Sequence, residues 1–579
     1  MFNSLAPMRL KKLLKVFCAS VVLLAATSVV LFFHFGGQII IPIPERTVTL
    51  STPPANDTWQ FQQFFNGYLD ALLENNLSYP IPERWNHEVT NVRFFNRIGE
   101  LLSESRLQEL IHFSPEFIED TSDKFDNIVE QIPAKWPYEN MYRGDGYVIV
   151  GGGRHTFLAL LNINALRRAG NKLPVEVVLP TYDDYEEDFC ENHFPLLNAR
   201  CVILEERFGD QVYPRLQLGG YQFKIFAIAA SSFKNCFLLD SDNIPLRKMD
   251  KIFSSELYKN KTMITWPDFW LRSTSPHYYH NITKTPIGDK RVRYFNDFYT
   301  NPNEYYYGDE DPRSEIPFHD REGTIPDWTT ESGQLVINKE VHFPAILLGL
   351  FYNFNGPMGF YPLLSQGGAG EGDKDTFVAA SHYYNLPYYQ VYKNCEMLYG
   401  WVDHANSGRI EHSAIVQYNP IVDYENLQSV KAKAEIILKN HEPDSRKKSS
   451  KPKSYSKTRL STHVKGSIYS YRRLFRDSFN KANSDEMFLH CHTPKIEPYR
   501  IMEDDLTLGR NKEAKQRWYG GRKNRVRFGY DVELYIWELI DQYICDKNIQ
   551  YKIFEGKDRD ALCGSFMREQ LGFLRSTGD

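Results

Sequence analysis

A short apolar run that ends in two carboxylates places the strongest constraint on the fold of this chain. Residues 237–239 are Phe-Leu-Leu, and Asp240, Ser241 and Asp242 follow directly. The run is too short for a free-standing helix and is typical of a buried strand. Open α/β sheets bind ligands at the carboxyl ends of their strands. The sequence therefore predicts a buried strand whose end presents two hard oxygen ligands, suited to a divalent cation that bridges to a diphosphate.

The Asp-x-Asp pattern by itself has little specificity. It occurs three more times, at Asp309/Asp311, Asp373/Asp375 and Asp558/Asp560. None of those pairs follows an apolar strand, which singles out Asp240 and Asp242. The alternative for the pair is a polar strand end at which Asp242 begins a turn into Ile244-Pro245.

The region before this strand alternates between strand and helix patterns. Residues 147–150 read as a strand, 157–168 as an amphipathic helix and 175–180 as a second strand. This order predicts the opening of a doubly wound α/β sheet. Gly151, Gly152 and Gly153 form the turn after the first strand, but Thr156 stands where a dinucleotide-binding fingerprint requires its last glycine. Gly151 and Gly152 still permit a nucleotide to approach the backbone, with a plain tight turn as the alternative.

The N-terminus predicts a membrane anchor. Residues 16–35 are uncharged and apolar, about the ~20 residues that span a bilayer as a helix. Four basic residues precede the run, which favours a cytoplasmic N-terminus of residues 1–15 and a lumenal remainder. A cleaved signal peptide is the rival, but the apolar run continues past the small residues at 25–28. Four N-x-Ser/Thr glycosylation acceptors agree with a lumenal chain: Asn56, Asn76, Asn260 and Asn281.

Composition divides the rest of the chain. A net charge of -5 gives no reason to expect a nucleic-acid partner. Residues 441–485 crowd lysine and arginine among serines, which is typical of a mobile, solvated insertion, with a dock for acidic glycans or membrane as the alternative. We therefore expect a stem with a helical lead-in at 36–140, a catalytic core at 141–430 and a C-terminal segment at 486–579 that completes the core.

Eight cysteines allow two local disulfides. Cys18 falls in the apolar N-terminal run, which leaves seven, so at least one is expected to stay free or to pair outside the chain. Cys190 with Cys201, and Cys545 with Cys563, are close enough in sequence to form local pairs. Cys236 opens the apolar strand and is expected to be buried. The chain has no CxxC pair, the spacing that is typical of zinc sites.

Further chemistry-bearing residues lie on both sides of the Asp-x-Asp strand. Lys224, upstream, and Lys495, downstream, could hold phosphates where a leaving group gains negative charge. His490, with His492 as second choice, could join Asp240 and Asp242 in binding Mn²⁺ or Mg²⁺, because Mn²⁺ accepts mixed oxygen and nitrogen ligands. A glycine-dense acidic loop at 366–375 presents Glu371 and Asp373 as candidates for contact with acceptor hydroxyls. Trp266 and its neighbours Asp268 and Trp270 could form a sugar platform or a core corner.

From residue 151 to residue 423 the chain resembles the fungal Golgi α-1,2-mannosyltransferases that branch N-glycan outer chains. The resemblance rests on ordered blocks: Tyr221–Lys224, Leu238–Pro245, Trp266–Trp270, Thr274–Pro276, Glu331–Gln334, Tyr361–Gly367, Gly370–Lys374, Tyr418–Pro420 and Pro494–Lys495. It implies a GT-A fold on a mixed sheet, GDP-mannose as donor, Mn²⁺, a type II Golgi membrane protein, retention of configuration, and complexes with other Golgi mannosyltransferases. Gln334, Glu371 and Asp373 would then lie nearest the reacting sugars. The basic insertion at 441–485 has no match in the family pattern.

These observations predict a metal-dependent α-1,2-mannosyltransferase that extends mannan or N-glycan outer-chain branches. Transfer with α-1,3 linkage, or a phosphomannan-modifying step, is the alternative within the same family. A non-catalytic mannan-binding protein on the same fold is the alternative from another class. A lumenal hydrolase would also use paired carboxylates, but it would need neither nucleotide nor metal.

Overall fold

The computed structural model describes residues 55–79, 96, 100–293, 311–402, 408–439, 485–509, 512, 514–519 and 522–578. All of these belong to one compact unit, Thr52–Asp579. The predicted anchor at 16–35 and the basic insertion at 441–484 lie outside the described residues. Among the helices that the structure describes, none is both long and apolar enough to cross a membrane.

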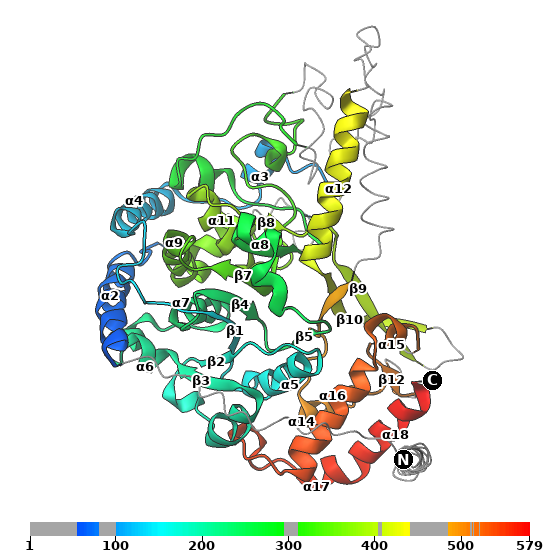
Figure 1. Cartoon of the computed structure of the whole chain (residues 1–579). Coiled ribbons are helices and arrows are strands. Elements are labelled where there is room, and N and C mark those ends of the chain that lie inside the picture. Colours follow the sequence, from blue (N-terminus) through cyan, green and yellow to red (C-terminus); the bar gives the residue numbers. More distant parts are fainter. Residues whose placement is uncertain are drawn as a thin grey trace, which may run out of the picture. The chain divides into compact units, whose positions relative to one another are not determined.

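A mixed seven-stranded sheet forms the centre of the unit (Figure 1). Strands β3, β2, β1 and β4 run parallel in that order, and β7 adds antiparallel to β4, followed by β6 and β8. The strands are β1 (Asp145–Val150), β2 (Val175–Leu179), β3 (Ala199–Ile203), β4 (Asn235–Leu239), β6 (Met263–Pro267), β7 (Thr330–Asn338) and β8 (Tyr389–Gln390). The predicted α/β class and doubly wound start are therefore confirmed.

Both faces of this sheet are covered, which explains why its central strands are continuously apolar. In β4, Cys236 and Leu238 belong to one hydrophobic core, while Phe237 and Leu239 belong to the other. This alternation follows from the period of two along a strand. The apolar run read from the sequence is thus a strand buried on both sides.

Helices from distant parts of the chain build the two cores (Figure 1). One core receives α2 (Ala55–Glu74), α3 (Glu104–Gln108), α4 (Pro115–Gln131), α6 (Leu204–Phe208), α7 (Phe223–Ala230), α9 (Phe343–Phe354), α10 (Tyr361–Ser365) and α11 (Thr376–Tyr383). The other receives α5 (His155–Arg168), α8 (Glu256–Lys261), α12 (Pro420–Lys439), α14 (Pro498–Glu503), α15 (Arg522–Phe528), α16 (Val532–Ile540) and α18 (Met567–Thr577). The helical lead-in predicted before residue 140 thus packs on the sheet.

A second, antiparallel sheet joins the C-terminal part to the site strand. Its order is β12 (Gln516–Arg517), β9 (Glu396–Val402), β10 (Gly408–Tyr418), β11 (Glu486–His490) and β5 (Asn243–Pro245). Strand β5 begins directly after Asp242, and its pairing with β11 sets His490 opposite Asn243. A residue nearly 250 positions downstream is thereby brought to the end of β4.

Both predicted disulfides are present. Cys190 pairs with Cys201, and Cys545 pairs with Cys563. Cys236 is buried and free, as expected, and Cys395 and Cys491 are also free and buried.

Candidate functional site

The Asp-x-Asp segment is held in place by backbone contacts. The N–H of Asp240 donates to the carbonyl of Gly333 at 2.8 Å, which extends the β4–β7 pairing by one residue. Asn162 of α5 donates to the carbonyls of Asp240 and Asn243 at 2.9 and 2.8 Å. Asn243 in turn donates to the carbonyl of Gly333 at 2.8 Å. The two carboxylates therefore project from a rigid strand end.

His490 completes a three-residue cluster with these carboxylates. Ligand atoms of Asp240, Asp242 and His490 all lie within 4.8 Å of one another, and Asp242 and His490 are buried. The His490 Nε2 atom lies 3.4 Å from the Asp242 Oδ1 atom. Across β7, a Cβ on Gly333 would come within 3.0 Å of His490 Nδ1, so glycine is what allows the ring to sit there. Among the described residues, the cluster thus includes His490 and not His492, whose Nδ1 atom lies 3.3 Å from the His490 carbonyl oxygen.

Two lysines neutralise the carboxylates. Lys495 contacts the Oδ2 atom of Asp242. Lys224, buried at the start of α7, donates to Asp240 Oδ2 at 2.9 Å and to the Ser332 hydroxyl at 3.0 Å. The sequence predicted that both lysines bind phosphates. In the structure, both contact carboxylates of the Asp-x-Asp pair.

Electrostatics keep this cluster charged. Burial by itself would raise the pKa of Asp242, but the charges and hydrogen bonds of His490 and Lys495 hold it well below its ordinary value. Burial would lower the pKa of His490, but the neighbouring Asp242 raises it to about 9. Burial would likewise lower the pKa of Lys224, and Asp240 and Asp373 together raise it. Each buried charge is therefore matched by an opposite one.

Asp373 lies beside Lys224 at the edge of this cluster. Its Oδ2 atom is 3.8 Å from Lys224 Nζ, and its Oδ1 atom accepts a hydrogen bond from the Ser332 hydroxyl at 3.0 Å. The Oδ2 atom accepts no hydrogen bond within the described part of the chain. Burial raises the pKa of Asp373 to about 6, and Asp240 adds to the effect. Asp373 is the residue of the acidic loop that reaches the site.

Buried ion pairs fix the acidic loop. Arg272 pairs with Asp375 at 2.8 Å with both side chains fully buried, and Lys374 contacts Asp268. The Glu371 carboxylate accepts a hydrogen bond from the N–H of Gly367 within the same loop. In the aromatic segment around Asp268, Trp266 is a core residue, because it is fully buried and donates to the Tyr418 carbonyl, whereas Phe269 and Trp270 are partly exposed.

Gln334 and the glycine turn occupy positions that differ from the expected roles. Gln334 is fully buried in β7, opposite Leu239, and its Oε1 accepts a hydrogen bond from Asn243 Nδ2 at 2.5 Å. Gln334 therefore holds Asn243, the residue directly after the Asp-x-Asp segment, in position. In the turn, the N–H groups of Gly151, Gly152 and Gly153 already donate to Val178, Thr156 and Asp184. These three amides are thus engaged by the protein itself.

Two residues at the site were not found from the sequence. The His155 Nδ1 atom lies 2.9 Å from the Ser241 hydroxyl, which places this imidazole between the glycine turn and the Asp-x-Asp segment. Tyr221 is 58% exposed, and its ring lies 3.2 Å from the point where a Cβ on Gly372 would be. The signal for His155 is topological, because this residue follows the glycine turn at the carboxyl end of β1.

The donor set of the cluster fits a divalent cation. Two carboxylates and one imidazole are the ligands that Mn²⁺ takes, with Asp242 Oδ1 facing His490. A cation held there would act as a Lewis acid and neutralise charge on a departing diphosphate.

Among the predicted glycosylation sites, Asn76, Asn260 and Asn281 are exposed, and the side chain of Asn56 lies outside the described part.

Comparison with known proteins adds an independent line. Residues 144–419 match the mannosyltransferase family Mannosyl_trans3. The chain is 37% identical to the α-1,2-mannosyltransferase MNN23 of Candida albicans, over 82% of this chain and 78% of that protein. It is 34% identical to MNN2 of Saccharomyces cerevisiae, over 83% and 78%, and 33% identical to MNN5 of that yeast, over 76% and 74%. A solved galactosyltransferase, LgtC, aligns with 42% of this chain and 73% of its own at 11% identity and a TM-score of 0.23, too low to support an argument.

Proposed function

Because this chain belongs to the fungal α-1,2-mannosyltransferase family, we propose that it transfers mannose from GDP-mannose to mannan or N-glycan outer-chain branches with a divalent cation, Mn²⁺ by preference. The mixed sheet with Asp-x-Asp at the end of its central parallel strand is consistent with a GT-A arrangement. Because GDP-mannose is α-linked, an α-linked product means retention of configuration.

Each residue of the cluster has a part in this reaction. Asp240, Asp242 and His490 would hold the cation. Lys495 stands on the Asp242 side and would bind the diphosphate, where its charge offsets the negative charge that develops on departure. Lys224 stands between Asp240 and Asp373, and these three would orient the hydroxyls of the donor sugar. His155, fixed against Ser241, would close the diphosphate side.

The observation that carries the proposal is the convergence of Asp240, Asp242 and His490 at one strand end. The three residues come from two segments nearly 250 positions apart, and β5–β11 pairing exists only in the folded chain. A scaffold that only bound mannan would have no need for a buried, charge-balanced cation site. Localisation in the Golgi membrane is also part of the proposal: the anchor rests on the apolar pattern of residues 16–35, and the Golgi rests on the family resemblance.

A donor panel followed by linkage analysis tests the function. The full chain should transfer mannose from GDP-mannose, but no sugar from UDP-linked donors, to a mannoside in the presence of Mn²⁺. Nuclear magnetic resonance of the product should show a new α-1,2 linkage. An α-1,3 product would replace the linkage assignment, and mannoside binding without transfer, indifferent to Mn²⁺ and GDP, would favour the binding protein instead.

A further inference from the structure

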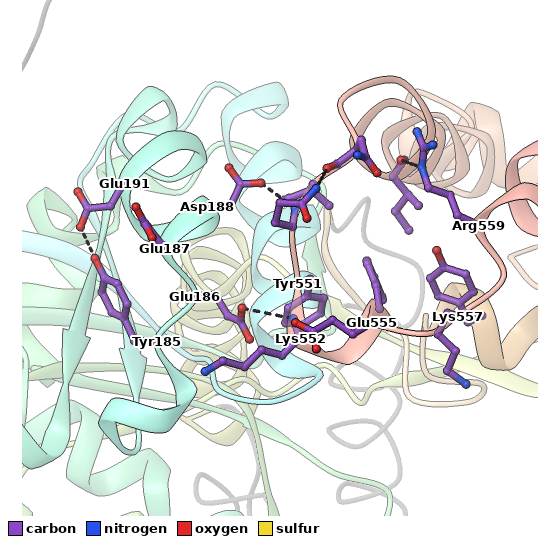
Figure 2. A pocket seen from close by; sticks show the side chains of 16 residues that line it. Tyr185, Glu186, Glu187, Asp188, Glu191, Tyr551, Lys552, Glu555, Lys557 and Arg559 are labelled. Carbon is purple, nitrogen blue, oxygen red and sulfur yellow. Dashed lines mark hydrogen bonds between the residues drawn. The ribbon is translucent and has the colours of Figure 1, made fainter.

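A large cavity has no residue of the Asp-x-Asp cluster in its lining. It has a volume of about 1050 Å³ and opens between the segment after β2 and the C-terminal segment (Figure 2). One wall carries Tyr185 and the acidic run 186–191, and the other carries residues 544–559. The volume slightly exceeds the ~300–1,000 Å³ typical of small-molecule pockets, so several sugar rings would fit.

An aromatic cluster lies at the C-terminal wall of the cavity. Tyr499, Tyr551 and Phe554 form a cluster, with ring centroids 5.0 Å apart for Tyr499–Phe554 and 4.8 Å apart for Tyr551–Phe554. Tyr185 adds a fourth ring from the opposite wall. Tyr499 and Tyr551 are each only 5% exposed and belong to the core, so the partly exposed rings of Phe554 and Tyr185 are the ones that can meet the mixed apolar and polar surface of a sugar.

The charges of the cavity disfavour an anion and leave carboxylates that can accept hydrogen bonds from hydroxyls. Its cations are turned to the protein: Lys552 donates to the Asp183 carbonyl, Lys557 to Glu503 and Arg559 to the Ile544 carbonyl. The carboxylates of Glu187 and Glu555, both exposed, accept no hydrogen bond and form no ion pair among the described residues. An anion would meet unpaired negative charge here. The metal-type cluster found in the described chain lies elsewhere, at Asp240, Asp242 and His490.

Each wall contains a disulfide, and the second wall also contacts the glycine turn. Cys190–Cys201 closes the first wall and Cys545–Cys563 closes the second. The Tyr551 hydroxyl donates to the Gly153 carbonyl. A smaller cavity of about 280 Å³ shares Tyr499, Tyr551, Phe554 and Lys557 with the large one and reaches Arg154, directly after the turn. Rigid walls of this kind are expected of a preformed binding site.

From this cavity we propose a second carbohydrate site, which holds a mannose oligosaccharide remote from the reacting end. The proposal rests on the proposed function for the identity of the sugar. The carboxylates of Glu187 and Glu555 would accept hydrogen bonds from ring hydroxyls, and the partly exposed rings of Tyr185 and Phe554 would pack against sugar faces. A long acceptor would then bind more tightly than a short one, while transfer to short acceptors would not involve the cavity.

The double variant Glu187→Ala with Glu555→Ala tests this proposal in the full chain. Both residues are exposed, so folding should be preserved. A charged hydrogen bond contributes enough that losing two should raise the KM for a long mannan oligosaccharide by about tenfold or more, with the KM for a mannose disaccharide within about twofold. The matched control is Glu119→Ala with Glu130→Ala on α4, two exposed glutamates away from the cavity.

Direct binding separates this proposal from the proposed function. Calorimetry with the mannan oligosaccharide, without GDP-mannose or metal, should show binding to the wild-type chain that weakens at least about tenfold in the double variant. Equal binding by wild type, double variant and control would overturn the second site, whether or not the chain transfers mannose. An equal loss of activity on short and long acceptors would also overturn it. Absence of transfer by the wild type would count against the proposed function alone.

Discussion

At the scale of single residues, Asp373 shows that the site has an electrostatic cost. Burial raises its pKa to about 6, against ~3.9 for an exposed aspartate. Because the folded pKa is the higher one, the folded state favours the protonated form. The stability that Asp373 contributes is therefore fully present below about pH 4 and is lost as the pH rises through about 6.

Replacement of Asp373 by asparagine should therefore stabilise the protein at neutral pH. We expect Asp373→Asn to raise the free energy of unfolding by up to about 3 kcal/mol near pH 7.5, with the gain shrinking towards zero near pH 4. Transfer of mannose should fall at the same time. Chemical denaturation at both pH values measures this. A variant less stable than wild type at both would contradict the burial argument.

Tyr221 is an exposed aromatic residue that lies against Gly372 of the acidic loop. If its ring supports a sugar, Tyr221→Ala should raise the acceptor or donor KM by about 3- to 10-fold, the range expected from loss of one aromatic contact. Tyr221→Phe, which keeps the ring, should change KM little. Tyr79→Ala removes another exposed tyrosine and serves as the control. Steady-state kinetics in which Tyr221→Ala matches the control would remove Tyr221 from the site.

At the scale of elements, the sequence predicted what is local. Strands β1, β2 and β4, helix α5 and both disulfides follow from apolar runs, glycine turns and short cysteine spacings. The structural role of Gln334 could not be predicted from the sequence, because a strand pattern does not show whether a polar residue faces a cleft or is buried beneath it. The choice of His490 over His492 depended on β11–β5 register, and strand pairing at such separation leaves no local signal.

The acidic loop depends on the Arg272–Asp375 pair. Both side chains are fully buried, so Arg272→Met would leave an unpaired buried carboxylate and should lower the free energy of unfolding by about 3–5 kcal/mol. Adding Asp375→Asn removes that charge and should recover part of the loss. Denaturant titration of the wild type, the single and the double variant measures it. A single variant within about 1 kcal/mol of wild type would show that the pair contributes little.

At the scale of the whole molecule, family membership identifies the chain as a mannosyltransferase, and the fold brings its candidate site residues together. The predicted N-terminal membrane anchor rests on the sequence alone. An apolar run at 16–35 predicts anchoring, and four acceptor asparagines predict a lumenal chain. In a fungal cell, we expect the protein to sediment with membranes, to lose mass on endoglycosidase treatment, and to become soluble when residues 1–35 are deleted. A glycosylated but soluble full chain would indicate a cleaved signal peptide instead.

The most direct test of the account compares Asp242→Asn with Asp560→Asn. Asp242 belongs to the candidate metal cluster with Asp240 and His490. Asp560 is an exposed residue of another Asp-x-Asp pair, in the C-terminal segment. With GDP-mannose, Mn²⁺ and a mannoside, Asp560→Asn should transfer mannose as the wild type does, and chelation should stop both. Asp242→Asn should fall by at least about 100-fold, since loss of one transition-state charge contact costs ~2.7–4 kcal/mol. Wild-type transfer by Asp242→Asn would contradict the central claim.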